Sequence, residues 1–557
     1  MTTSGARKNH LVDGIIVLGF GIFALLYQLG RWQGASPYLF LESDAANIAG
    51  FAAAWDHPMS FVGDPVLGDP RNFRMYSVIH IPILRTLAKW TGDYGTAFLL
   101  LLGPAVFVHA TGFYLLGRVV FLRRLWAVIL AIVTLMPVTL NLGEYWGLYQ
   151  DAQPRFVFQA LLPLLLAAAY YWRSVPAAWP WLMGAAGLLI YIHPPSVPAW
   201  GLAIWSGLWV FHPPFWSLKK RLGYMALLGG VSVFVALPFL LHVLQNQAHG
   251  SPQGAAYDQI REIMVVRFTE AYLDVPTALK DFILLWSHKW FLWVWAFAGT
   301  MAMVYLRPDS RKDIALVGIW LAGLLTASVG IPFTEQAITR YYHLIPVEID
   351  LIRGLRYTIP FMLLLCVWPL TEIDKKLERA WAPLLIFRTT AVIGVFAVLI
   401  GNYWQDSPLR DTVSCWRRQK LVCMTQREQQ TMDALIAVHQ HTPPGATILP
   451  TAYELPIRYY ALRPVVYAWK DGSILAYTNR TALVKWYETY KEWMASVANE
   501  ANRKNPAARI KALVVLSRKL GADYLFVDFV IGPDLAGSGG TEIIWSNGVF
   551  SILKIDT

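Results

Sequence analysis

Two carboxylates lie in the segment that follows the first hydrophobic stretch of the chain. Glu42 and Asp44 flank Ser43, in a sequence in which charged residues are scarce. A carboxylate at the edge of a membrane span does not help insertion, so it either caps a helix or takes part in chemistry. Because a helical pattern starts at Ala45, we expect Ser43 or Asp44 to cap that helix, and a capping residue can also be catalytic.

A second polar segment, residues 144–155, carries Glu144, Asp151 and Arg155 together with three aromatic rings. Two carboxylates from separate loops can hold a divalent cation such as Mg²⁺ or Mn²⁺ through oxygen ligands, or act as base and orienter for an attacking hydroxyl. Two plainer interpretations are an aromatic belt with Asp151 as a cap before Pro154, and an ion pair that makes Asp151 and Arg155 structural. The residues alone leave these alternatives open.

Three further side chains are candidate substrate contacts. Arg353 and Arg356 are three residues apart, so they share one face of a helix and could grip one phosphate group. The alternative is snorkelling toward lipid headgroups, which fits Arg353 better than Arg356. His193, in Tyr191–Pro195, is by default a satisfied interface residue, but its predicted position level with the other polar groups makes it a candidate.

The composition places these residues in a membrane protein. Of 557 residues, 56% are hydrophobic and 15% charged, whereas soluble proteins are roughly 45–50% apolar and about 25% charged. The net charge of +11 is better explained by basic cytoplasmic loops than by binding to nucleic acid. The three cysteines exclude a disulfide scaffold, although Cys415 and Cys423 are close enough in sequence for one local bridge.

About eleven segments are apolar over the roughly 20 residues that a membrane span needs. They are residues 12–30, 96–117, 125–143, 156–172, 179–193, 197–213, 222–244, 285–305, 313–331, 355–371 and 383–403. The first is not expected to be a cleaved signal peptide, because its apolar core is too long and no small-residue cleavage site follows it.

Basic residues fix the expected orientation, because short cytoplasmic loops are rich in Lys and Arg. If the amino terminus is inside, every loop on that side is basic. In chain order, the basic residues of these five loops are Arg118, Arg123 and Arg124; Arg173; Lys219, Lys220 and Arg221; Arg307, Arg311 and Lys312; and Lys375, Lys376 and Arg379. The carboxyl terminus is then outside. The predicted external segments are 31–95, 144–155, 245–284, 332–354 and 404–557.

Several arginines contradict this rule by lying in or next to the segments predicted to be external. They are Arg71, Arg74, Arg155, Arg261, Arg267, Arg340, Arg353 and Arg356. A basic residue in such a place needs a local reason, and binding of an anionic headgroup or a phosphate is a natural one, because guanidinium forms bidentate hydrogen bonds.

Two of the external segments are long enough to fold. In residues 31–95 we expect a helix over Ala45–Trp55, turns at Gly63-Asp64-Pro65 and Gly68-Asp69-Pro70, and an interfacial helix over Tyr76–Trp90. Residues 404–557 alternate between helical and strand patterns, which predicts a small external α/β domain. Its expected helices are Gln426–His441, Leu483–Ala498 and Arg509–Leu520, and its strands Ala446–Leu449, Pro464–Tyr467 and Asp523–Val527, before a terminal hairpin at Asn547-Gly548.

The whole layout resembles the GT-C membrane glycosyltransferases, which use polyprenyl-phosphate-linked sugars. The resemblance depends on Glu42-Ser43-Asp44, the acidic loop with Glu144 and Asp151, the run Arg353–Tyr357, and the stretch Ile457–Gly472, which looks like uncharacterised bacterial members. Phosphate-cradling GxxxxGK[ST], dinucleotide-binding GxGxxG, HExxH and CxxC motifs are absent from the sequence, so a transferase would draw its donor from the membrane.

The resemblance implies a transferase of hexoses or pentoses, inverting at the anomeric carbon, in a bacterial inner membrane. Residues 1–403 would form the transmembrane domain and residues 404–557 a periplasmic domain. Asp44 would be the base and Asp151 its partner, both also being metal ligands if a divalent cation is used. Glu42, Glu144, Arg155, His193, Arg340, Arg353 and Arg356 would contact the lipid donor or a glycan, lipid or protein acceptor. Ser43 stands where many members have a second adjacent acid, which leaves metal dependence open.

Two other functions fit parts of the sequence. A catalytically inactive relative would serve as a structural or lipid-binding subunit of an envelope complex. A transporter would need paired charges near mid-membrane and internal symmetry, whereas the unusual charges here collect at one predicted external edge, so transport is the weakest alternative.

Overall fold

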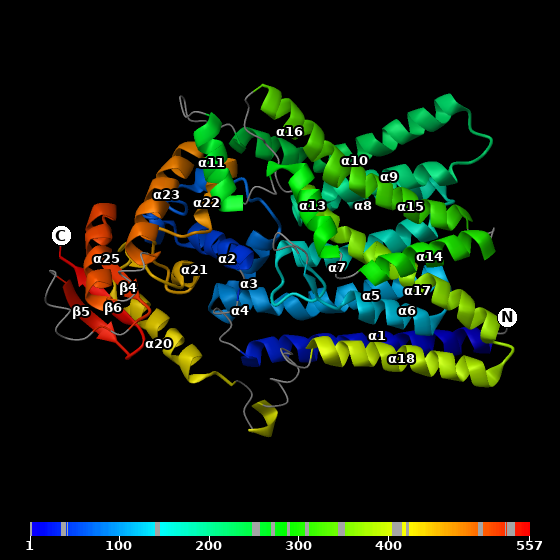
Figure 1. Ribbon diagram of the computed structural model, residues 1–557, viewed down its shortest axis with the longest axis horizontal. Coiled ribbons are helices and arrows are strands. Elements are labelled where there is room, and N and C mark those ends of the chain that lie inside the picture. The colour runs from blue at the N-terminus through cyan, green and yellow to red at the C-terminus, as the bar shows by residue number, and fades with distance from the viewer. Residues whose placement is uncertain are drawn as a thin grey trace. The chain divides into compact units, whose positions relative to one another are not determined.

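The structure is a computed structural model that describes residues 3–34, 41, 43–139, 145–247, 257–268, 273–286, 290–306, 311–342, 351–403, 415–418, 423–498, 505–529, 531 and 541–556. The predicted site residues Glu42 and Glu144 lie outside these ranges. The chain divides into two compact units, whose elements are labelled in Figure 1. Unit 1 comprises Met1–Gln28, Leu102–Leu240 and Phe268–Arg410, and unit 2 comprises Leu29–Leu101, Leu241–Arg267 and Asp411–Thr557.

Six helices are long and apolar enough to cross a membrane, which agrees with a multi-pass membrane protein. They are Leu11–Arg31, Tyr94–Phe121, Pro154–Tyr171, Leu218–Asn246, Arg311–Tyr341 and Leu351–Leu377. Each contains or overlaps one predicted span. Their apolar side chains are often exposed, as in the fourth helix, where Phe234 is 75% exposed.

Four of the other five predicted spans contain shorter helices, and residues 383–403 contain a helix of 23 residues. In 125–143 the helix is only 11 residues long, about 16 Å, because Pro137 lacks an N–H and disfavours a helical residue before it. The chain then forms a two-stranded antiparallel ladder instead. The helices in the five segments are α6 (Arg124–Thr134), α8 (Trp179–Leu188), α9 (Val197–Leu208), α14 (Trp290–Leu306) and α18 (Trp381–Tyr403).

The remaining elements of unit 1 are built around these helices. The short strands are β1 (Val138–Thr139) and β2 (Tyr145–Trp146), and the others are α1 (Thr3–Gly34), α5 (Leu102–Phe121), α7 (Pro154–Tyr171), α10 (Leu218–Gln247), α13 (Val275–Trp286), α15 (Arg311–Leu325), α16 (Ile331–Tyr341), the 3₁₀ helix η11 (Leu351–Tyr357) and α17 (Thr358–Leu377). Small residues let backbones approach closely: a Cβ on Gly112 of α5 would lie 2.7 Å from Pro163 of α7.

The loops predicted to be cytoplasmic meet at one end of unit 1. Asp13 is 2.8 Å from Arg124 and 3.5 Å from Arg118. Arg173 is 3.2 Å from Asp313, and Arg123 pairs with Glu378. The acids and bases of these pairs come from segments assigned to the same side, so the packing of unit 1 agrees with the predicted alternation of its spans. Which side faces the cytoplasm stays a prediction.

Unit 2 contains a four-stranded sheet in the order β3-β4-β6-β5, with β3 and β4 parallel and the other pairs antiparallel. The strands are β3 (Ile448–Pro450), β4 (Tyr524–Val527), β5 (Thr541–Ser546) and β6 (Ser551–Ile555). Its helices are α2 (Ser43–Asp56), α3 (His80–Thr91), α4 (Tyr94–Leu100), α11 (Tyr257–Phe268), α20 (Gln426–His441), α21 (Glu454–Tyr459), α22 (Asp471–Thr478), α23 (Arg480–Trp493) and α25 (Pro506–Leu520).

Most of the expected elements of the carboxyl-terminal segment are present, and one is wrong. The hairpin turns at Asn547-Gly548, where Gly548 has φ +80°. The expected strand Pro464–Tyr467 is reduced to a single bridge between Val465 and Ile448. Pro464 has no N–H to donate, and the Val465 N–H donates to the Asp64 carboxylate at 3.1 Å, so a regular ladder cannot form.

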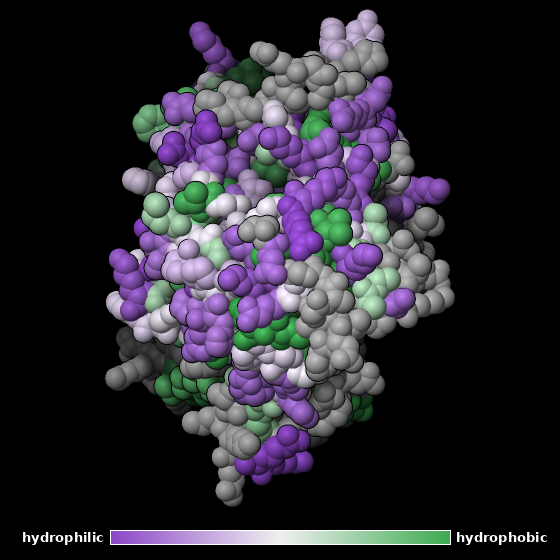
Figure 2. All heavy atoms as spheres, turned by 90° about the vertical axis from the view of Figure 1, so that its left-hand side faces the viewer, coloured by the Kyte–Doolittle hydropathy of each residue, from purple (hydrophilic) through white to green (hydrophobic). Residues whose placement is uncertain are grey.

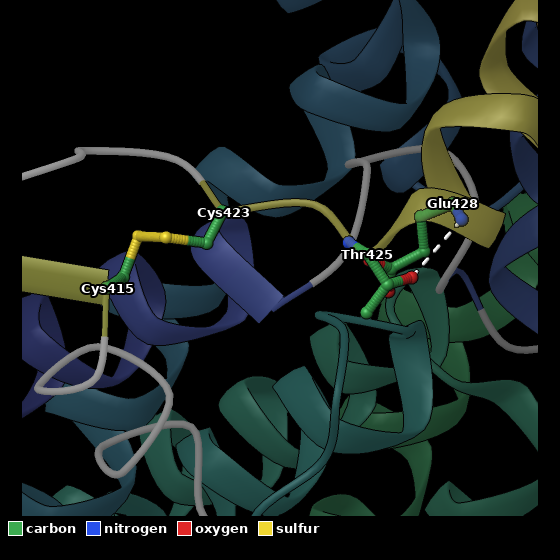
Figure 3. The surroundings of a disulfide bond; sticks show 4 residues. All are labelled: Cys415, Cys423, Thr425 and Glu428. Carbon is green, nitrogen blue, oxygen red and sulfur yellow. Dashed lines mark hydrogen bonds between the residues drawn. A yellow bond between two sulfur atoms is a disulfide. The ribbon is translucent and has the colours of Figure 1, made fainter. Parts of the chain in front are cut away.

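A disulfide joins Cys415 to Cys423 just before α20 (Figure 3). The helix then starts with a capping box, in which the Glu428 N–H donates to Thr425 Oγ1 at 3.2 Å and the Thr425 N–H to Glu428 Oε2 at 2.6 Å. Disulfides are typical of proteins outside the reducing cytoplasm, and the external position of this segment stays a prediction. The face drawn in Figure 2 is mainly hydrophilic.

Candidate functional site

The end of unit 1 away from the basic loops gathers most of the predicted site residues. Helix α7 carries Arg155 in its first turn and is followed by Arg173, and its 18 residues correspond to about 27 Å. The polypeptide segment of η11 and α17 likewise begins near Arg353 and ends near Lys375. Both segments therefore connect the basic end of unit 1 with its opposite end, which we call the polar end.

Asp151 is fully buried in the turn before α7. Its Oδ1 accepts a hydrogen bond of 3.2 Å from the Gln153 N–H, and Gln153, not Asp151, occupies the N-cap position. The preceding Tyr149 carbonyl accepts a 2.9 Å hydrogen bond from Tyr27 Oη. Asp151 is thus not the expected helix cap, because its carboxylate is held by the turn before α7. A buried carboxylate in such a segment is a candidate functional group.

A chain of side-chain hydrogen bonds links His193 to η11. His193 Nδ1 lies 2.8 Å from Ser196 Oγ, which lies 2.6 Å from Tyr357 Oη. Ser196 and Tyr357 are both buried. His193 is therefore held in a defined orientation at the polar end, and the three groups can shift protons among themselves by exchanging donor and acceptor roles.

Two arginines lie near Tyr357. Arg155 and Arg356 both act on it electrostatically, and the Arg356 guanidinium carbon is 5.8 Å from the Tyr357 ring centroid. Arg356 Nε donates to the Arg353 carbonyl at 3.0 Å, as expected where residues three apart eclipse in a 3₁₀ helix. Arg356 is only 2% exposed, so snorkelling does not describe it.

Aromatic rings enclose this group. The Tyr357 ring lies 5.6 Å from Trp200, 5.8 Å from Phe158 and 6.1 Å from Trp146, measured between centroids. All four rings are almost completely buried. Packed rings lower the local polarity, which strengthens the interaction of the arginines with any anion that reaches them.

Arg340 is engaged elsewhere. Its Nη2 is 2.7 Å from Asp274 Oδ1 and 3.0 Å from the Leu273 carbonyl. The out-of-place charge predicted to contact substrate thus has a structural partner, which the sequence did not indicate because Asp274 lies on a different segment.

Asp44 belongs to unit 2, in the first turn of α2. The helix begins at Ser43, so Asp44 is inside it rather than in front of it. Its Oδ1 lies 2.5 Å from Lys470 Nζ. The side chains are 27% and 20% exposed, respectively, which leaves this carboxylate partly accessible.

The residue after Lys470, Asp471, belongs to a buried cluster of charged side chains. Arg458 Nε and Nη2 lie 2.7 and 2.8 Å from the Asp64 carboxylate, and Nη1 and Nη2 lie 2.6 and 2.8 Å from Asp471. Burial raises the pKa of Asp471, while Arg458 opposes that shift. Burial works against the charge of Arg458, but Asp471 and Asp64 together raise its pKa above the ordinary value. We refer to Arg458, Asp64 and Asp471 as the buried ion cluster.

Unit 2 also has a cavity of about 470 Å³, lined by Ser60, His439, Gln440, His441, Thr442, Pro443, Pro444, Leu462 and Arg463. Arg463 directs Nη2 to the carbonyls of His439 and Thr442, so it holds the turn together. The predicted site residues do not line this cavity.

The sequence did not single out Ser196, Tyr357 or the residues of the buried ion cluster. Tyr357 was part of a quoted motif without a role, and Ser196 ends the run His193–Ser196. In the part of the chain that the structure describes, three or more His, Cys, Asp or Glu side chains do not come together as a metal-binding group.

Comparisons with known proteins give a match of low similarity among solved structures. No protein-family model matches the chain, and no curated protein is significantly similar to it. Among solved structures, it matches the crystal structure of ArnT from Cupriavidus metallidurans bound to undecaprenyl phosphate, with 12% identity over 99% of this chain and 98% of that chain and a TM-score of 0.40. Identity and TM-score at this level transfer neither substrate nor mechanism.

Proposed function

We propose that the chain is a membrane glycosyltransferase. It moves a hexose or pentose from a polyprenyl-phosphate-linked donor to a glycan, lipid or protein acceptor at the external face of a bacterial inner membrane. The observation that carries the proposal is the polar end of unit 1, where Asp151 and Arg356 are buried and where His193 and Arg356 lie beside the rings of Phe158 and Tyr357, in a membrane protein. Ionisable residues buried in an apolar, membrane-spanning unit are costly, and they often mark a substrate or ion site.

The arginines supply the donor site in this proposal. Arg353 and Arg356 both belong to η11, where Arg356 Nε donates to the Arg353 carbonyl, and Arg155 is close enough to Tyr357 to influence it electrostatically. Guanidinium remains charged at any accessible pH and forms bidentate hydrogen bonds with phosphate oxygens. Held in aromatic surroundings, such groups would bind the phosphodiester of the donor and stabilise the phosphate as it leaves.

Asp44 is the proposed base, and Asp151 its partner in ordering the site. The acceptor hydroxyl loses its proton to the Asp44 carboxylate while its oxygen bonds to the anomeric carbon. The bond between that carbon and the phosphate oxygen breaks, and the polyprenyl phosphate leaves with the electron pair. Attack from the side opposite the phosphate inverts the anomeric configuration.

The test uses the full chain in proteoliposomes with lipids from the native membrane and a panel of donors, undecaprenyl-phosphate-linked glucose, mannose, galactose and arabinose. Release of undecaprenyl phosphate and labelling of an acceptor are measured together. Because a positioned base contributes about 10²–10⁴-fold, Asp44→Asn should lower kcat by that factor, and Asp151→Asn by at least about 10-fold.

Asparagine keeps the oxygen that accepts the Gln153 N–H, so Asp151→Asn should remain folded. Asp69→Asn is the matched control, since Asp69 pairs with the exposed Arg71. Full transfer by both Asp44→Asn and Asp151→Asn would refute the proposed roles. Donor binding with no transfer by wild type would favour the non-catalytic lipid-binding subunit.

A divalent cation held by Asp44 and Asp151 stays a prediction. The same transfer assay decides it: activity that is lost in EDTA and restored by Mg²⁺ or Mn²⁺ supports the cation, and activity unchanged in EDTA excludes a dissociable one.

A further inference from the structure

The carboxylate of Asp44 is contacted by the carboxyl-terminal segment of unit 2. Lys470 Nζ and Asp44 Oδ1 are 2.5 Å apart. At this distance the ion pair restricts the orientation of the carboxylate. A general base must face the hydroxyl that it deprotonates, so Lys470 can control the orientation that the proposed role of Asp44 requires.

The backbone of Lys470 is fixed from both sides. Its carbonyl accepts hydrogen bonds from the Ser473 N–H at 3.1 Å and from Ser473 Oγ at 2.7 Å. Arg267 Nη2 donates to the same Ser473 Oγ at 2.8 Å, and the Arg267 guanidinium lies 5.2 Å from the Trp469 ring centroid. The rotatable part that remains is the Lys470 side chain itself.

The buried ion cluster fixes the next residue. Asp471 is fully buried and bound by Arg458, which also binds Asp64. Asp64 additionally accepts the N–H groups of Val66 and Leu67 at 3.0 and 2.9 Å. The backbone of Lys470 is therefore held next to the buried ion cluster, while its ammonium contacts the partly exposed carboxylate of Asp44.

We infer that Lys470 is a positioning residue for Asp44. It holds the carboxylate in one orientation until an acceptor hydroxyl arrives, and it transfers no proton itself. The inference rests on the proposed function, in which Asp44 is the base, and it extends the reaction site to the carboxyl-terminal segment of the chain.

Carbodiimide cross-linking tests the contact without any substrate. This reagent joins a lysine amine to a carboxylate in direct contact through an amide bond. We expect peptide mass spectrometry of the full chain to find a bond between Lys470 and Asp44, and Lys470→Arg to abolish it. The Lys519–Glu492 pair, 2.7 Å apart on the surface of the same unit, is the internal control. A Lys519–Glu492 cross-link without a Lys470–Asp44 cross-link would overturn the inference.

Kinetics on the donor that supports transfer test the role. Because misplacing a catalytic group by about 1 Å can cost about 10²-fold, Lys470→Met should lower kcat by about 10–100-fold with the donor KM within about 2-fold. Lys470→Arg should restore most of kcat, since it keeps the charge. In an Asp44→Asn background, Lys470→Met should add less than about 2-fold, because interacting residues are not additive. Lys519→Met is the control and should transfer like wild type.

The outcomes separate this inference from the proposed function. An inactive Asp44→Asn with a fully active Lys470→Met overturns the inference alone. A raised donor KM with unchanged kcat in Lys470→Met assigns Lys470 to the donor phosphate and also overturns it. Full activity of Asp44→Asn, or no transfer by wild type from any donor in the panel, removes the base that Lys470 would position and overturns both.

Discussion

Two neighbouring ionic contacts of different kinds join the amino-terminal and carboxyl-terminal segments of unit 2. In the buried ion cluster, Arg458 is 3% exposed, Asp64 is fully buried and Asp471 is 1% exposed. One residue earlier in the chain, Lys470 meets Asp44 with side chains that are 20% and 27% exposed. In the first contact Arg458 binds both carboxylates through paired hydrogen bonds, and in the second Lys470 Nζ lies 2.5 Å from Asp44 Oδ1.

The difference separates an anchor from an adjustable contact. Arg458 is bound by carboxylates on two sides, so its removal leaves buried charge without compensation. The Lys470–Asp44 pair is partly hydrated, so breaking it costs little in stability. A carboxylate that must receive a proton and release it suits the second environment, whereas the first suits a fixed structural joint.

The largest expected effect comes from breaking the anchor. Arg458→Met leaves the carboxylates of Asp64 and Asp471 buried together, so it should lower the free energy of unfolding by about 3–5 kcal/mol. Unfolding of the full chain in detergent, followed by tryptophan fluorescence against added SDS, measures the change.

A triple variant sharpens this result. Arg458→Met combined with Asp64→Asn and Asp471→Asn removes all three charges, and should regain much of the lost stability because no buried charge remains. Arg71→Met, which removes the guanidinium from an exposed ion pair, should unfold like wild type. An Arg458→Met protein as stable as wild type would show that the cluster is not an anchor.

A smaller effect is expected from the glycine that follows Asp471. A Cβ on Gly472 would lie 2.6 Å from Trp486 Cη2, and the Trp486 indole is held by a 2.9 Å hydrogen bond from Nε1 to the Ala468 carbonyl. Because the ring cannot shift freely, Gly472→Ala should cost about 1–3 kcal/mol through overpacking. The same SDS titration measures it, and Gly318→Ala, whose Cβ would meet nothing within 4 Å, is the control. Equal stability of the two variants would contradict the tight packing beside the anchor.

Features that depend on local pattern could be predicted from the sequence. The six long helices follow from runs of apolar residues, and the hairpin at Asn547-Gly548 follows from a two-residue turn signal. The alternation of basic loops also assigned Asp151, His193 and Arg356 to one end of the spans. The limit is visible at 125–143, where hydrophobicity suggested a span but Pro137 ends the helical region early.

Contacts between distant segments could not be predicted. The partner of Arg340 is Asp274, that of Arg458 includes Asp64, and Ser196 meets Tyr357. Each pair joins segments that are far apart in sequence, and neither periodicity nor motif spacing reports which of them pack together. The same limit explains why the pairing of Lys470 with Asp44 could not be predicted from the sequence.

The smallest expected effect is on the adjustable contact itself. Lys470→Met should change the free energy of unfolding by less than about 1 kcal/mol, because a partly exposed ion pair is only slightly more stable than the same two charges separated and hydrated. The SDS titration used for the anchor variants measures it, with Lys519→Met as the control for loss of an exposed lysine. A loss as large as that of Arg458→Met would make Lys470 part of the anchor. A loss near zero, together with reduced kcat, would leave Lys470 acting on Asp44 rather than on the fold.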